Sequence, residues 1–273
     1  MAAPGGSGFR ARRARWATIN AMSDVSALAH VAAAAAAVGA GAVNAIAGGG
    51  TLISFPVLTA IGVPSVNANA TNTVALCPGY VGGTLALRDE IAASGVPLRA
   101  RLLVSGLGGL TGALLLLSTS NTVFRSLVPY LILLSCLLLA LQDPMRRWVS
   151  RHRAGRDLRS AELGGIFLAG AYGGYFGAGL GIMLIAVLGL FSSIPFVQLN
   201  AVKQPLAAAI NLSAAAFLVF SGKIEWSLVA VMAPAALVGG ALGGRSSRFL
   251  PPQKFRIVVV AIGVVISIVY LVR

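Results

Sequence analysis

Two glycine clusters, each followed by a short apolar stretch and then by an asparagine, are the residues of this sequence best suited to binding a ligand. The first is "GGGT" at 48–51, and Asn72 follows Gly48 by 24 residues. The second is "GAGLG" at 177–181, and Asn200 follows Gly177 by 23 residues. Glycine lets the backbone approach a ligand without an intervening side chain. A helix that begins at such a cluster presents free N–H groups and the positive end of its dipole, and both favour an anion.

Lys203 supplies a positive charge near the second of these asparagines, within an apolar stretch. Burying an ammonium group costs several kcal/mol unless it lines water, pairs with a carboxylate or meets an anion. The seven acidic residues all lie at or near the ends of apolar stretches, so none is placed to pair with it. We therefore expect Lys203 to contact an anion. The alternative is that its helix begins later and the side chain reaches the membrane interface.

The predicted site combines the glycine clusters with the polar residues around them. Close helix packing through small residues is the alternative for the glycines, but it does not explain the polar side chains. The predicted substrate-binding residues are Asn44, Gly48, Gly49, Gly50, Thr51, Thr71, Asn72, Thr73, Gly177, Gly179, Gly181, Asn200 and Lys203.

The composition places these residues in a membrane. The chain is 57% hydrophobic and 10% charged, with a mean hydropathy of +0.87, which is far from a soluble domain. Its net charge of +14 comes from basic residues gathered at 10–15, 146–159 and 245–256, between apolar stretches. This pattern is typical of cytoplasmic loops and lipid headgroup contacts rather than nucleic-acid binding.

Signatures of catalysis are missing from the sequence. There is no His cluster at metal spacing, no Walker A motif and no pair of carboxylates within an apolar stretch. Cys77 and Cys136 lie in apolar stretches without a CxxC or Cys/His pattern, so we expect neither a disulfide nor a metal site. We predict a protein that is not an enzyme and has no cofactor.

Eight apolar stretches reach the roughly 20 residues that a helix needs to cross a bilayer. They are 25–47, 66–87, 98–118, 123–142, 161–180, 197–220, 226–244 and 255–272. Two further stretches, 52–62 and 182–191, are half as long and are predicted to be re-entrant half-helices. Irregular backbone at membrane depth must be satisfied by protein or water, so these pieces should face the interior.

The chain repeats itself. "GAVNAIAGGGTL" at 41–52 resembles "GAYGGYFGAGLG" at 170–181, and each is followed by a short apolar piece, a proline and a polar helix start. We predict an all-α polytopic membrane protein of about eight transmembrane helices in two four-helix repeats, each with a Gly-rich break and a re-entrant half-helix. The predicted regions are a disordered basic tail (1–24), a first repeat (25–142), a basic linker (143–160) and a second repeat (161–273).

Charge predicts the orientation. The linker holds six arginines and is expected in the cytoplasm. An even number of spans in each repeat would leave the repeats in the same orientation and both termini in the cytoplasm as well. The basic residues Arg245, Arg248, Lys254 and Arg256 disagree, because this arrangement places them outside.

Coupling to another ion is not required by the sequence. His30 is the one Asp, Glu or His residue at membrane depth, and because it lies near the start of the first predicted span we expect it to be an interfacial or packing residue. Export of an anion is downhill in an inside-negative cell by about 2.3 kcal/mol per charge per 100 mV. Sodium bound by backbone groups is the alternative left open.

Three segments resemble the sulfite exporter TauE/SafE family of membrane permeases. They are "VNAIAGGGTLISFPVLTAIGVPSVNANATNT", "GAYGGYFGAGLGIMLIAVLGL" and "LNAVKQPLAAAINLSAAAFLVFSGKIEW", and the likeness covers residues 25–272. The resemblance implies a multi-span transporter of sulfite, sulfoacetate or related small sulfur-containing anions, commonly directed outward. Asn44 stands where the family's first repeat often carries an acidic residue, and this departure removes a negative charge beside the predicted site.

We therefore expect a permease of the bacterial inner membrane that exports small sulfur oxyanions by alternating access, with the anion and the lipid bilayer as its partners and no nucleic acid. The oligomeric state is left open. The alternatives are a transporter of an organic acid or a cation, and a membrane scaffold without transport.

Overall fold

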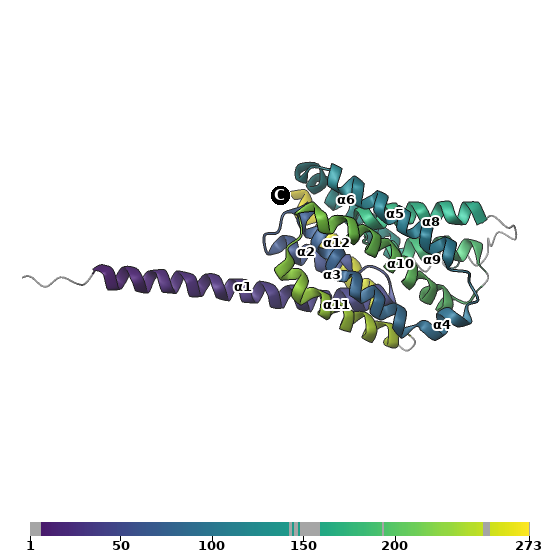
Figure 1. The fold of residues 1–273 in the computed structure, drawn as a ribbon, viewed down its shortest axis with the longest axis horizontal. Helices are drawn as coiled ribbons and strands as arrows, with labels where there is room; N and C mark the ends of the chain where they lie inside the picture. The colour runs from purple at the N-terminus through teal and green to yellow at the C-terminus, as the bar shows by residue number, and fades with distance from the viewer. Residues whose placement is uncertain are drawn as a thin grey trace, which may run out of the picture.

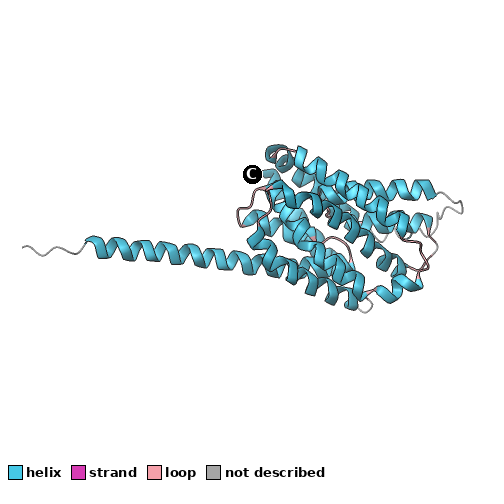
Figure 2. Cartoon of the chain, viewed as in Figure 1, coloured by secondary structure: helices cyan, strands magenta, loops and turns pink. Residues whose placement is uncertain are grey.

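The protein is all-helical in the computed structural model, which describes residues 7–141, 144, 147, 159–192, 194–247 and 252–272 (Figure 2). No strand occurs in this part of the chain. The helices, labelled as in Figure 1, are α1 (Ser7–Ile46), α2 (Thr51–Ala60), α3 (Ser65–Ala86), α4 (Arg88–Ala93), α5 (Arg99–Ser118), α6 (Asn121–Ala140), α8 (Arg159–Tyr175), α9 (Leu180–Phe191), α10 (Phe196–Leu218), α11 (Trp226–Ser246) and α12 (Pro252–Val272). Most of the basic linker lies outside the described residues.

Five segments of these helices are long and apolar enough to cross a membrane: Ala27–Ile46, Arg99–Ser118, Asn121–Ala140, Phe196–Ser221 and Trp226–Ser246. The predicted spans 66–87, 161–180 and 255–272 correspond to α3, α8 and α12, which are not among the five. Asn and Thr residues make α3 more polar, and α8 has only 17 residues. The structure therefore supports an apolar helical bundle but does not confirm eight spans.

The first helix is longer than predicted. It begins at Ser7, so it includes most of the tail that we expected to be disordered. Ala and Arg, which are abundant in this tail, are among the strongest helix formers. Figure 1 shows α1 projecting well beyond the bundle.

The two short helices turn back along the helices that precede them. A Cβ atom on Gly165 of α8 would lie 2.9 Å from Val187 of α9, and one on Gly173 would lie 2.8 Å from Leu180, so α9 runs antiparallel to α8. A Cβ atom on Gly39 of α1 would likewise lie 3.8 Å from Ile53 of α2. At 1.5 Å per residue, α2 and α9 are about 15–18 Å long, or half the thickness of a bilayer core. Each pair is a helical hairpin.

These hairpins determine which helix ends lie together at each end of the bundle. In Figure 1 the projecting α1 and the C-terminus lie at one end of the bundle, whereas α8 begins at the other end. Arg101 of α5 and Glu162 of α8 pair at 2.7 Å in the first turns of both helices, so α5 also begins there. The expectation that the basic linker and both termini share one side does not hold, because each half begins with a hairpin that returns to the end from which it entered.

The first helix of each half packs against a helix of the other half. Helix α1 packs on α11, and α8 packs on α5; α11 also contacts α3, and α5 also contacts α10. Glycines four residues apart make both crossings close, because a Cβ atom on any of them would strike the backbone of the facing helix. These pairs are Gly239 with Val38, Gly243 with Ala42, Gly108 with Phe167 and Gly112 with Ala171.

Candidate functional site

The two predicted glycine clusters touch each other. A Cβ atom on Gly48 would lie 2.7 Å from the Cα atom of Gly181, and a Cβ atom on Gly181 would lie 2.7 Å from the Cα atom of Gly48. Only glycine fits at such a backbone contact. The breaks that the sequence places 129 residues apart therefore meet in one location.

The glycines of each cluster have different roles. Gly48 has φ +84° and Gly177 has φ +79°, and their N–H groups donate to the carbonyls of Val43 and Tyr172, in the last turns of α1 and α8. The two glycines therefore end helices rather than open half-helices as predicted. Gly50 is the N-cap residue of α2. Gly179, with φ +77°, is the N-cap residue of α9.

Asn44 caps the first half-helix. Its Oδ1 accepts a hydrogen bond of 2.7 Å from the N–H of Gly50. This bond satisfies one of the N–H groups that a helix start leaves free. Asn44 therefore positions the break.

Helix α6 supports the second break. The carbonyl of Ala178 accepts hydrogen bonds from the hydroxyls of Tyr172 at 2.7 Å and Ser135 at 3.0 Å. Neither hydroxyl residue was among the predicted site residues. Their only signal is that each is an isolated polar group in an apolar stretch. The predicted site residues Gly49 and Gly179 also pack on α6, against Leu139 and Ser135.

Lys203 lies beside the contact between the breaks. The side chain is 1% exposed, and a Cβ atom on Gly181 would lie 3.4 Å from its Nζ. No group among the described residues forms a hydrogen bond with Nζ. The ammonium therefore stays buried in the protein, which contradicts the alternative that it reaches the interface.

Amide side chains of α10 and α3 form hydrogen bonds with the ends of α1 and α8. The carbonyl of Ala45 in α1 accepts hydrogen bonds from Gln204 at 2.9 Å and from Asn200 at 3.4 Å. The carbonyl of Tyr175 in α8 accepts one of 2.8 Å from Asn69. Asn69 and Gln204 were not among the predicted site residues. The signal for Asn69 is a shared spacing, because Asn69 precedes Asn72 by three residues as Asn200 precedes Lys203. The signal for Gln204 is its place next to Lys203 in an apolar stretch.

Thr51 and Asn72 also lie at the site. The Nδ2 of Asn72 donates to the Oγ1 of Thr51 at 3.5 Å. A Cβ atom on Gly177 would lie 3.8 Å from the same oxygen, so the two residues lie where α8 ends.

The two remaining threonines face elsewhere. The hydroxyl of Thr71 accepts a hydrogen bond of 3.0 Å from the N–H of Glu225 before α11. The hydroxyl of Thr73 donates to the carbonyl of Asn69 in its own helix at 2.9 Å. The structure thus gathers most of the predicted residues at the breaks and directs Gly49, Gly179, Thr71 and Thr73 toward other neighbours.

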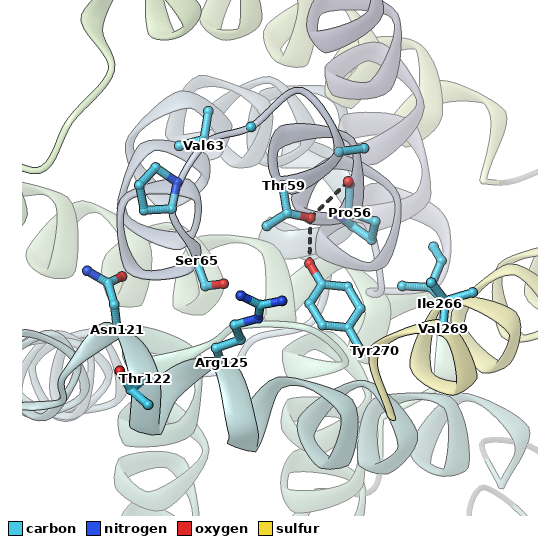
Figure 3. Close-up of a pocket in the computed structure, with 13 residues that line it drawn as sticks. Pro56, Thr59, Val63, Ser65, Asn121, Thr122, Arg125, Ile266, Val269 and Tyr270 are labelled. Atoms are coloured by element: carbon cyan, nitrogen blue, oxygen red, sulfur yellow. Dashed lines mark hydrogen bonds between the residues drawn. The ribbon is translucent and has the colours of Figure 1, made fainter. Parts of the chain in front are cut away.

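A separate pocket of about 590 Å³ opens at the far end of α2. It lies between α2, α3, α6 and α12, and among the described residues that line it Arg125 carries the charge (Figure 3). At its wall the hydroxyl of Tyr270 donates to Thr59 at 2.6 Å. No predicted site residue lines this pocket.

Known proteins resemble this chain over most of its length. The family described as "Sulfite exporter TauE/SafE" matches residues 33–270. The probable membrane transporter protein YfcA of Escherichia coli K12 is 26% identical over 228 residues, which cover 84% of each chain. A probable membrane transporter protein of Haemophilus influenzae is 30% identical over 205 residues, 74% of this chain and 79% of the relative. No solved structure matches the chain.

Proposed function

This chain belongs to the sulfite exporter TauE/SafE family, and on this premise we propose that it is a permease of the bacterial inner membrane that exports small anions, with sulfite or organosulfonates as substrates. Two relatives are named probable membrane transporters, which supports transport. The substrate class rests on the family and on the charge of the site.

The observation that carries the proposal is the unpaired ammonium of Lys203. A buried ammonium with neither a hydrogen-bond partner nor a carboxylate is costly, and a bound anion lowers that cost. The ion pairs among the described residues are Arg101–Glu162 and Arg88–Asp89, and neither supplies a carboxylate to Lys203. Gly181, in the first turn of α9, places the positive end of a helix dipole beside the same ammonium. Lysine and the helix start together favour an oxyanion.

Transport by this site requires the two breaks to separate. Because the backbones of Gly48 and Gly181 are in contact, an anion has no route between them in this conformation. We propose that the halves are inverted repeats, each made of a hairpin and three further long helices, which rock against each other. The crosswise packing of α1 on α11 and α8 on α5 supports this arrangement.

The test is sulfite flux into proteoliposomes that contain the purified protein, with potentials of either sign. We expect saturable flux whose direction follows the potential as for an anion; cation transport would reverse the sign of the current. Loss of a charge-assisted hydrogen bond costs about 1.5–3 kcal/mol, so Lys203→Met should weaken apparent sulfite affinity by about 10- to 100-fold.

Lys223→Met is the matched control, because Lys223 lies in the loop before α11. This variant should transport sulfite as the wild type does. Absence of sulfite flux in folded protein would refute the substrate assignment. Unchanged flux in Lys203→Met would remove Lys203 from the site.

A further inference from the structure

Two buried oxygen atoms of α3, next to the end of α8, accept no hydrogen bond from the described residues. Asn69 and Asn72 are 0% and 2% exposed, and no group among the described residues donates to the Oδ1 of either. Their Nδ2 groups donate to the Tyr175 carbonyl and to Thr51. A carbonyl accepts only from the amide NH₂, so the bond to Tyr175 fixes which way the Asn69 amide points. Buried acceptors without a donor cost free energy unless a ligand satisfies them.

These oxygens lie close together. Asn69 and Asn72 are three residues apart on α3 and so share one helix face. Both amides contact groups at the end of α8: Asn69 bonds to Tyr175, and Thr51, the partner of Asn72, lies beside Gly177. The C-terminal end of a helix carries the negative end of its dipole, which favours a cation.

The other half of the protein offers a direct comparison. Asn200 and Lys203 follow Asn69 and Asn72 by the same 131 residues. Asn200 bonds to the Ala45 carbonyl at the end of α1, just as Asn69 bonds to the Tyr175 carbonyl at the end of α8. The ammonium of Lys203 thus occupies the position that corresponds to Asn72. In one half the covalently attached ammonium of Lys203 accompanies one unsatisfied oxygen, the Oδ1 of Asn200, whereas the other half presents two unsatisfied oxygens and no cation.

We propose that Asn69, Asn72 and Thr51 form a binding site for a monovalent cation, with sodium as the expected ion. The three side chains supply neutral oxygen ligands, and none of them is a carboxylate of the kind that dominates calcium and magnesium sites. Half-helix ends and unwound backbone provide such sites in other transporters. The cation site stands independently of the proposed function; only the coupling of cation to anion rests on it. Since binding is reciprocal, a cation here and an anion at Lys203 would each strengthen binding of the other.

The test measures thermal unfolding of the full-length protein in detergent, with sodium, lithium, potassium or choline as the only added cation. We expect at least one alkali ion to raise the unfolding temperature above that in choline. Asn72→Leu should reduce the apparent affinity for this ion at least tenfold. Asn67→Ala, which alters a half-buried asparagine on the same helix, should keep the wild-type response.

Asn72→Lys is the second variant, because it copies the arrangement of the other half. The Asn72→Lys protein should fold. Its unfolding temperature should be the same whichever cation is present. Equal unfolding temperatures in choline and in all alkali ions, or an undiminished alkali response in both Asn72 variants, would overturn the site.

Sulfite flux in the same salts separates this inference from the proposed function. Flux that requires the stabilising alkali ion supports coupling, whereas full flux in choline refutes it and leaves sulfite transport intact. If sulfite does not move at all, the transport proposal fails, and the unfolding measurements still decide the cation site.

Discussion

Individual side chains at the breaks divide into those that build the backbone and those whose polar atoms are left for a ligand. The residue types and spacing predicted which stretches would be polar, and Asn44, Thr51, Asn72, Asn200 and Lys203 do gather at the breaks. The residue types and spacing did not predict which way each side chain points. Thr71 and Thr73 flank Asn72 in sequence, but each is rotated by about 100° around the helix and bonds to a different neighbour.

Asn44 offers a prediction at this scale. Asn44→Asp keeps an oxygen that can accept from the Gly50 N–H, whereas Asn44→Leu removes it. Loss of a capping side chain costs about 1 kcal/mol, so the leucine variant should unfold at a lower temperature than the aspartate variant in detergent. Equal unfolding temperatures for the two variants would show that the Asn44 cap does not stabilise the break.

At the scale of helices, hydropathy predicted most boundaries closely, as in the predicted span 66–87 and the observed α3 (Ser65–Ala86). The path of the chain after each glycine break was not predictable in this way. Apolar length reports how far a helix reaches, but not whether the next helix continues onward or returns. Packing decides this, through contacts such as Gly165 with Val187 between α8 and α9.

The contact between the breaks makes a prediction about two helical glycines. A Cβ atom on Gly181 meets the backbone of Gly48, which cannot move aside as a side chain can, whereas a Cβ atom on Gly164 meets nothing within 4 Å. Gly181→Ala should therefore destabilise the protein by about 1–3 kcal/mol. Gly164→Ala should stabilise it by about 0.4–1 kcal/mol. Thermal unfolding of both variants checks this, and a Gly181→Ala protein as stable as Gly164→Ala would contradict the contact.

For the whole molecule, the hairpins bring several basic helix ends to one end of the bundle. There α5 starts with Arg99 and Arg101, α8 starts with Arg159 after the linker, and the α11–α12 connection leaves α11 after Arg245. The eight-span prediction placed the basic α11–α12 connection on the side opposite to the basic linker. In the structure α11 ends at the same end of the bundle as α8 begins. The arginines at 10–15 lie toward the opposite end and oppose this bias. Loops with more basic residues face the cytoplasm, so we predict that the linker end is cytoplasmic and the termini face outward.

Thiol labelling tests this orientation. Cys77 and Cys136 are buried, so a membrane-impermeant reagent should report mainly on introduced cysteines. Thr122→Cys at the pocket end should be labelled in spheroplasts, and Ser160→Cys at the linker end should be labelled only after permeabilisation. Labelling of Ser160→Cys alone in sealed spheroplasts would reverse the orientation, and labelling of both there would contradict their placement at opposite ends.

The central claim is that the buried ammonium of Lys203 is kept for an anion at the cost of stability. Thermal unfolding of the wild type and Lys203→Met, with and without sulfite, tests it most directly. Replacing a buried ion pair with apolar side chains is often neutral or stabilising by about 1–4 kcal/mol. Lys203 has no ion-pair partner among the described residues that the change would leave unpaired, so without sulfite the methionine variant should unfold at the same or a higher temperature. Sulfite at 100 times its wild-type dissociation constant should stabilise the wild type by about 2.7 kcal/mol and Lys203→Met by only about 0.4–1.4 kcal/mol. A variant that is less stable without sulfite, or that sulfite stabilises as much as the wild type, would contradict the account.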